Sequence, residues 1–220
     1  MRKTIFSEGE FYHLYNRGVD KRTVFVNKED HDRFQAYLYI LNDASNERFG
    51  KDFIPSKRGE LYQRQRIEPL VAIGAYCLMP NHFHILATPL VENGIPKFMH
   101  KLQTAYTMYF NQKMTRTGSL FQGTYKSQHV DSDVYLKYLY AYIHLNPTKL
   151  LTQNWYEASG EELRQLGTKI LAYPYSSAGE YNLGKFVITN PDPFPNYFEK
   201  TKDMRSLLQF WLKYKADFHQ

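Results

Sequence analysis

The sequence predicts an α+β fold, in which strands that include an antiparallel hairpin are flanked by helices and followed by a helical C-terminal extension. Three observations favour it: a strand-like segment near the N-terminus, about twenty residues of β propensity split by the turn MPN, and helical periodicity around them. The change in pattern predicts a core over residues 1–150 and an extension over residues 151–220.

The first predicted element is a strand. The segment EFYHLYNRGVDKRTVF is rich in aromatic and β-branched residues and breaks at NRGVDKR, which predicts a basic turn carrying Arg17, Lys21 and Arg22. From Asn27, a capping residue, first-turn acids and helical spacing of apolar residues predict an amphipathic helix. Residues 45–67 are polar, basic and aperiodic, and we expect an exposed excursion there.

The middle of the chain predicts a hairpin between two helices. In EPLVAIGAYCLMPNHFHILATPL the MPN turn divides two strands. GIPKFMHKLQTAYTMYFNQKM predicts a long helix with a stripe of Phe98, Leu102 and Met108. TRTGSLFQGTYKSQHV predicts a basic, Gly-punctuated loop or short strand, and DSDVYLKYLYAYIHLNP predicts a helix that ends before Pro147.

The extension carries weaker signals. SGEELRQL and PYSSAGEYN suggest short helices, and EKTKDMRSLLQFWLKYKADF predicts a final amphipathic helix. Packing on the core, self-association and covering of an active site are all compatible with the aromatic residues of this helix.

Composition favours a polyanionic partner. The formal net charge is +6, and aromatic residues make up 16% of the chain, more than core packing requires. The chain has a single cysteine, Cys77, which excludes an internal disulfide and favours a reducing cytoplasm. We expect Cys77 to be a small core residue. The N-terminal residues lack a leader-like apolar stretch, and no apolar run reaches about 18 residues, so we expect a soluble protein with no membrane partner.

Two histidines lie one residue apart in MPNHFHILATP. In a strand, His82 and His84 project from one face while Phe83 projects from the other. Two imidazoles can bind a divalent metal that still needs oxygen ligands, although such a pair can also occupy a strand without any ligand. Tyr142 and Asn146, one helical turn apart, can meet the same site.

Five segments together resemble a known family. YHLYNRGVDKRTVF, YCLMPNHFHIL, GSLFQGTYKS, YLKYLYAYIHLNP and YPYSSAGEY occur in this order over about residues 10–182. They resemble the REP-associated tyrosine transposases, a branch of the single-tyrosine HUH transposases with an IS200-like domain. The resemblance implies a ferredoxin-like core with a central antiparallel sheet, a divalent metal (Mg or Mn), and cleavage and rejoining of single-stranded DNA with REP-like hairpins through a 5′-phosphotyrosine.

The resemblance also implies roles for individual residues. Tyr142 corresponds to the nucleophile, His82 and His84 to the metal-binding histidines, and Asn146 to a metal-binding Gln of related transposases. His144 points away from Tyr142 on a helix, so we expect it to be structural or a neighbour to DNA rather than a third metal ligand. His13 would approach the metal only if its strand is central.

Basic and aromatic residues are candidate DNA contacts. We expect residues 116–126, just before the helix that carries Tyr142, to make most of the DNA contacts. We expect the excursion over residues 45–67 to add further contacts. The expected phosphate contacts are Arg17, Lys21, Arg22, Arg116 and Lys126, with Lys57, Arg58, Arg64 and Arg66 in the excursion. The residues expected to stack on bases are Tyr62, Phe121 and Tyr125.

Two other functions remain open from the sequence. One is a catalytically silent protein that binds structured DNA or RNA with the same fold. The other is a metal-dependent hydrolase, which needs a carboxylate near the hairpin, yet no Asp or Glu lies between Glu68 and Glu92. The sequence is compatible with a monomer or a homodimer, and with a tyrosine supplied in cis or in trans.

Overall fold

The computed structural model describes residues 5–45, 58–198 and 201–217. Its sheet contains β1 (Phe11–Arg17), β2 (Val71–Met79), β3 (His82–Pro89) and β4 (Lys126–Val130) in the order β2-β3-β1-β4. All three pairings are antiparallel.

The connections between the strands define the fold class. Helix α1 (Lys28–Ile40) joins β1 to β2, and α3 (Gly94–Lys113) joins β3 to β4. The order β-α-β-β-α-β with this sheet is the ferredoxin-like arrangement. The predicted α+β class, the hairpin split at MPN and the central antiparallel sheet are therefore confirmed.

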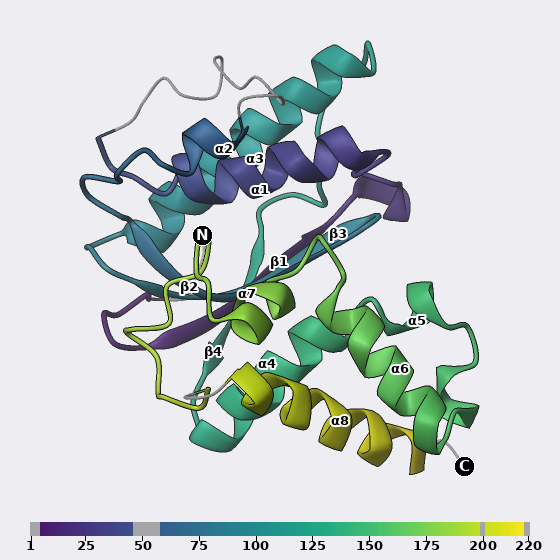
Figure 1. Cartoon of the computed structure of the whole chain (residues 1–220). Coiled ribbons are helices and arrows are strands. Elements are labelled where there is room, and N and C mark those ends of the chain that lie inside the picture. The colour runs from purple at the N-terminus through teal and green to yellow at the C-terminus, as the bar shows by residue number, and fades with distance from the viewer. Residues whose placement is uncertain (1–4, 46–57, 199–200, 218–220) are drawn as a thin grey trace.

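Helices cover both faces of the sheet (Figure 1). One face carries α1, α3 and the short α2 (Arg58–Leu61). The other face is covered by α4 (Asp133–Leu145) and by helices of the extension, which pack on one another. The extension contains α5 (Thr148–Leu151), α6 (Gly160–Leu171), α7 (Ala178–Leu183) and α8 (Thr201–Asp217).

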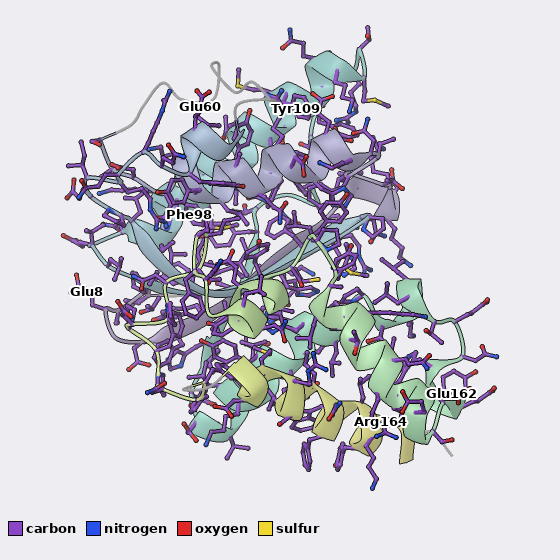
Figure 2. The ribbon with its side chains drawn as sticks, viewed as in Figure 1. Glu8, Glu60, Phe98, Tyr109, Glu162 and Arg164 are labelled. Atoms are coloured by element: carbon purple, nitrogen blue, oxygen red, sulfur yellow. The ribbon has the colours of Figure 1, made fainter. Side chains whose placement is uncertain are left out.

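Two hydrophobic clusters fill the spaces on either side of the sheet. In the first, Phe83 of β3 packs against Phe34 of α1, with Phe98 of α3 nearby in the same cluster (Figure 2). In the second, Cys77 of β2 and Leu208 of α8 belong to one cluster, so the extension shares a core with the sheet. Cys77 is fully buried, as expected, and burial raises the pKa of its thiol.

The buried stripe of α3 differs from the predicted one. Met108 is 63% exposed, so its predicted place in the core is wrong. Phe98 and Leu102 are buried as expected, and the stripe continues through Tyr106 and Phe110. Tyr106 belongs inside because its hydroxyl donates to the carbonyl of Val24 at 2.6 Å, which satisfies the polar atom that burial would otherwise leave unpaired.

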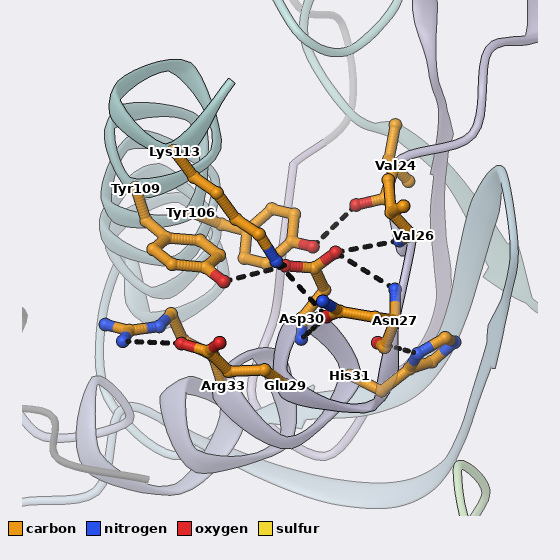
Figure 3. A network of polar contacts seen from close by, with 10 residues as sticks. All are labelled: Val24, Val26, Asn27, Glu29, Asp30, His31, Arg33, Tyr106, Tyr109 and Lys113. Carbon is orange, nitrogen blue, oxygen red and sulfur yellow. Dashed lines mark hydrogen bonds and ion pairs between the residues drawn. The ribbon is translucent and has the colours of Figure 1, made fainter. Parts of the chain in front are cut away.

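A buried carboxylate joins the start of α1 to the end of α3 (Figure 3). Asp30 Oδ2 accepts from the backbone N–H groups of Val26 and Asn27, at 2.8 and 3.2 Å, and completes a capping box with Asn27, the predicted capping residue. Asp30 Oδ1 accepts from the Tyr109 hydroxyl at 2.7 Å and from Lys113 Nζ at 2.6 Å. These bonds fix the helix layer behind the sheet.

Candidate active site

The two histidines of β3 lie on the face of the sheet that α4 covers. His84 is 6% exposed, while Phe83 between the histidines is fully buried in the opposite layer, as predicted. The register of β1 and β3 places Arg17 opposite His82 and Tyr15 opposite His84. Residues directly opposite in an antiparallel pair share a face, so these four side chains form one surface.

Helix α4 brings the tyrosine and the amide to this surface. The ring centroid of Tyr142 lies 5.4 Å from that of His84. Asn146, at the C-terminal cap of α4, places its side chain beside that of His82. The structure therefore brings together all four residues that the sequence singled out on β3 and α4.

Hydrogen bonds determine which nitrogen of His82 faces the helix. The Asn81 amide donates through Nδ2 to the Lys21 carbonyl at 3.0 Å, so its Oδ1 is the acceptor that lies 2.6 Å from His82 Nδ1. His82 Nδ1 must then carry the proton, and Nε2 keeps a lone pair. Asn146 Nδ2 donates to the Tyr142 carbonyl at 2.8 Å, which leaves Asn146 Oδ1 for the contact with His82. Two acceptor atoms that converge in this way fit a bound cation.

His84 has a partner on its Nδ1 as well. His13 Nε2 lies 2.8 Å from His84 Nδ1, and the two rings stack with centroids 5.0 Å apart. Strand β1 is central in the sheet, which is the condition under which His13 was expected to approach the metal site. Its contact is to His84, and this contact leaves Nε2 of His84 available to a ligand.

Burial keeps these histidines neutral. It lowers the pKa of His13 to about 4 and that of His82 to about 4, with Arg17 adding to the effect at His82. Burial and the neighbouring His13 hold the pKa of His84 well below its usual range. A neutral imidazole is the form that binds metal, so the donors are ready at neutral pH.

The same burial acts against ionisation of the tyrosine. Tyr142 is half-buried, and burial raises the pKa of its phenol, with Tyr138 and Tyr15 adding to the effect while Arg17 opposes it. Tyr142 is therefore protonated at neutral pH. The positive charge of Arg17 favours the ionised form of its phenol.

A cavity of about 580 Å³ surrounds these groups. Arg17 and Lys126, both proposed from the sequence as DNA contacts, line it. The sequence reasoning missed Tyr15, although the period of two in HLYNR places it on the face of His13 and Arg17. It also missed Gln122 and Lys149, for which no local pattern gives a signal. The remaining lining residues are Asn16, Met79, His82, Phe83, His84, Tyr142, Leu145, Asn146, Thr148 and Trp155.

Three loops meet at the end of β1 and fix the mouth of the cavity. The Gly18 N–H donates to the Asn81 carbonyl at 2.8 Å, and Asn16 Nδ2 donates to the Gly123 carbonyl at 3.0 Å. A Cβ on Gly18 would lie 2.4 Å from the Arg22 carbonyl oxygen, so only glycine fits this turn. The turn therefore positions Asn81, and through it His82.

Three other predicted DNA contacts lie on the turn after β1 and in the loop before β4. Lys21 and Arg22 are exposed on the turn after β1, where Arg22 also pairs with Asp20 at 3.2 Å. Arg116 donates to the side chain of Asn111 and, at 2.9 Å, to the Ser119 carbonyl, so it holds its own loop together.

Two of the predicted stacking residues are core residues. Phe121 is 4% exposed and packs against Phe83, with ring centroids 5.6 Å apart, and Tyr125 is 5% exposed. The prediction that they stack on bases is wrong, because neither ring offers an open face. Gly-punctuated loops with aromatic residues can fill a core as readily as they can bind a base.

The excursion is only partly described. Lys57 lies outside the described residues, and Arg58 begins α2. The guanidinium of Arg66 lies over the Tyr39 ring at 4.5 Å, and Tyr62 meets the edge of that ring at 5.4 Å. Both of these side chains help to hold the excursion against α1. Arg64 was also proposed as a DNA contact, and its backbone carbonyl accepts a hydrogen bond from the Tyr39 hydroxyl at 2.8 Å.

His144 is structural, as expected. It is fully buried, and its Nε2 lies 2.7 Å from Ser177 Oγ, which also accepts from the Tyr76 N–H at 2.9 Å. The motif YPYSSAGEY therefore ties α4 to β2, so a segment of the extension supports the helix that carries Tyr142.

The buried histidines predict an acid-sensitive fold. The pKa values of His13 and His144 fall from 6.5 to about 4 on folding, so their stability contribution is complete above pH 6.5 and is lost as the pH falls toward 4. The free energy of unfolding should fall by up to about 1.4 kcal/mol per pH unit for each such histidine. Urea unfolding at a series of pH values measures this slope. H13F should reduce it, and a midpoint that stays constant from pH 7 to pH 4.5 would contradict the prediction.

The donor set suits a mixed nitrogen and oxygen site. Within residues 5–45, 58–198 and 201–217, no three His, Cys, Asp or Glu side chains are grouped to hold a metal. Two imidazole nitrogens and one amide oxygen are thus what the protein offers, and the other positions would fall to water or substrate. Borderline divalent ions such as Mn²⁺ accept such a set, while Mg²⁺ prefers oxygen.

Comparisons with known proteins agree with this geometry. A family model described as "Transposase IS200 like" matches residues 11–146, a range that includes His82, His84, Tyr142 and Asn146. The comparison with curated proteins gave no match. A solved structure of a REP-associated tyrosine transposase bound to a REP hairpin has a TM-score of 0.51 and 12% sequence identity, with 91% of this chain and 96% of that chain covered.

The solved structure supports the fold, and the family model supports the membership. None of the helices that the structure describes is long and apolar enough to cross a membrane. The family model covers more than half of the chain, and the strand histidines and the helix tyrosine lie within the matched residues. The chain belongs to the IS200-like transposase family.

Proposed function

We propose that this protein cleaves and rejoins single-stranded DNA beside a hairpin, with Tyr142 as the nucleophile. The observation that carries the proposal is the meeting of Tyr142 with His84, at a ring separation of 5.4 Å, while Asn146 on the same helix contacts His82. A phenol next to two neutral imidazoles and an amide oxygen is suited to phosphoryl transfer rather than to acid–base chemistry.

The reaction would be a transesterification. The Tyr142 oxygen forms a bond to phosphorus as the phenol loses its proton, and the bond from phosphorus to the 3′ oxygen breaks. The products are a 5′-phosphotyrosine and a free 3′-OH, and rejoining is the reverse reaction with a 3′-OH. Arg17 stabilises the phenolate and the phosphate, because its charge already favours the ionised form of Tyr142.

Three residues would hold the divalent metal: His82 and His84 through Nε2, and Asn146 through Oδ1. When bound, the metal supplies Lewis-acid polarisation of the phosphate oxygens. Asn81 and His13 orient the two imidazoles by occupying their Nδ1 atoms.

The cavity suggests how DNA is held. Arg17, Lys126 and Lys149 line it and would contact phosphates, with Lys21 and Arg22 at its edge. Tyr142 lies beside the histidines of its own chain, which favours attack in cis and does not require a second subunit. We infer that residues 1–150 form the catalytic domain, that residues 151–220 support α4, and that the substrate is cellular DNA with REP-like hairpins.

The hydrolase alternative lacks a base. Among the described residues that line the cavity, none is Asp or Glu, so no carboxylate is placed to activate water. A catalytically silent DNA-binding protein remains the second candidate, since the basic cavity alone would serve it.

A covalent adduct separates these functions. The protein is incubated with labelled, hairpin-bearing single-stranded DNA, with Mn²⁺ or Mg²⁺ or with EDTA. The proposal predicts a denaturant-resistant protein–DNA adduct that requires metal and carries the label on the 5′-phosphate side. Hydrolysis would give cleaved DNA without an adduct, and a binding protein would give neither.

His13 provides a test of the metal site. H13F keeps a ring but removes the acceptor for His84 Nδ1–H, so we expect the affinity for Mn²⁺ to fall about 10- to 100-fold. Isothermal titration of the DNA-free protein with Mn²⁺ measures this. The control is H129F, on exposed β4, which should leave the affinity unchanged. Equal affinities for H13F and the unmodified protein would contradict the assignment.

A further inference from the structure

We propose that a row of aromatic rings on α4 and α8 binds the bases of the single-stranded segment next to the scissile phosphate. This inference rests on the proposed function, since it assigns a path to the strand that Tyr142 attacks. The row consists of Tyr142, Tyr138, Trp211, Phe210 and Tyr214.

The row begins at the nucleophile. The ring centroids of Tyr142 and Tyr138 are 6.0 Å apart, and Tyr135 stacks on Tyr138 from the other side at 6.4 Å. These three tyrosines follow one another at helical spacings of three and four, so they share one face of α4. Each is only partly buried, so each leaves part of its ring exposed on this face.

Helix α8 extends the row to the surface. It packs alongside α4 (Figure 1), and Trp211 meets the edge of Tyr138 with centroids 5.1 Å apart. Phe210 and Tyr214 lie beyond Trp211 and stack on each other with planes 19° apart. They are 62% and 44% exposed, so the row ends in open ring surface.

Packing does not explain the exposed end. The apolar stripe of α8 is already buried through Met204, Leu208 and Leu212, each fully inaccessible to solvent. Phe210 and Tyr214 lie outside this stripe, where a helix of this amphipathic type normally carries polar residues. Their exposed ring surface is therefore accessible to a ligand.

The chemistry of the surface favours nucleobases over a second copy of the chain. The exposed end is aromatic rather than aliphatic, and every base has a π-face that can stack on such rings. Exposed Lys213 lies between the two rings in sequence, and Arg205 is exposed on the same helix. With a net charge of +6, the chain attracts a polyanion and repels its own copies. The row is also continuous with Tyr142, where the strand must arrive.

The test compares two DNA ligands and two double variants. F210A/Y214A removes the exposed end, while F186A/Y156A removes two exposed rings elsewhere on the extension as a matched control. Fluorescence anisotropy measures Kd for a hairpin with a single-stranded flank and for the same hairpin without it. Both are measured without metal, so that no cleavage occurs.

We expect F210A/Y214A to raise Kd for the flanked hairpin about tenfold or more, because stacking contributes about 5- to 150-fold per base. Kd for the flankless hairpin should not change, and the control variant should match the unmodified protein. Trp211 fluorescence, recorded in a W155F background, should be quenched by flanked DNA alone.

Three results would overturn the inference. One is an equal effect on both hairpins, and another is no effect on either. The third is a sedimentation shift from dimer to monomer in F210A/Y214A, which would assign the rings to self-association. If flanked and flankless hairpins bind equally while the adduct still forms, the proposed function stands and only this inference fails. Absence of any hairpin binding would overturn both.

Discussion

Replacement of Tyr142 by Phe is expected to abolish the covalent adduct and to lower the rate of strand cleavage at least about 1,000-fold. The variant lacks only the oxygen that would attack phosphorus, and loss of a nucleophile removes the step itself rather than one contribution to it. The ring and its edge contact with His84 remain, so folding and hairpin binding should not change. Gel analysis of labelled DNA measures the adduct, and anisotropy measures the binding.

Tyr138 supplies the matched control for this experiment. It lies one turn away on the same face of α4, with ring centroids 6.0 Å apart, but has no place beside the histidines. Y138F removes only a hydroxyl and keeps the ring that the aromatic row would use, so it should keep the adduct. An adduct that persists in Y142F, or that is lost in Y138F instead, would show that the nucleophile has been assigned to the wrong tyrosine.

Replacement of Asp30 by Ala is expected to lower the free energy of unfolding by about 3 kcal/mol. The carboxylate is fully buried and accepts four hydrogen bonds, two from the start of α1 and two from the end of α3 (Figure 3). Its removal leaves Lys113 without its buried partner and removes half of the capping box of α1, and loss of one member of a buried pair costs about 3–5 kcal/mol. We choose the lower end because the Lys113 side chain is 25% exposed.

Urea unfolding monitored by tryptophan fluorescence measures this loss. R164A, which removes a surface pair with Glu161 on α6, should change the free energy of unfolding by at most about 0.5 kcal/mol. K113M should cost less than D30A, since Asp30 would keep the Tyr109 hydroxyl and both backbone donors. Equal losses in D30A and R164A would show that the network in Figure 3 is not a structural element of the helix layer.

Local patterns in the sequence predicted most of the secondary structure. The strand of His82 and His84, the MPN turn, the Asn27 cap and the helix that ends before Pro147 each depend on residues close together in the chain, and all four were confirmed. The spacing of side chains, two residues in strands and about 3.6 in helices, also predicted correctly which residues face the core where one side of the element is strongly polar. On α3 the apolar and polar residues are less separated, and Met108 was assigned to the wrong side.

The roles of aromatic residues required the tertiary structure. Phe121 and Tyr125 lie in a basic, Gly-containing loop, yet the fold turns both into the core, while Phe210 and Tyr214 lie in a helix and are exposed. A pattern of neighbouring residues in the sequence does not distinguish the buried rings from the exposed ones. Whether a ring meets the core or the solvent depends on which distant segment covers it.

By itself, the sequence determined the class of fold, the family resemblance and the four residues that the site is built around, because strand alternation and helical spacing fix which side chains share a face. The tertiary structure decided what surrounds them. The contacts of His13 with His84, of Asn81 with the Lys21 carbonyl and of Arg17 with the site join residues that are 60 or more positions apart in the chain. Burial, which sets the pKa values of the histidines and of Tyr142, exists only after both layers have packed on the sheet.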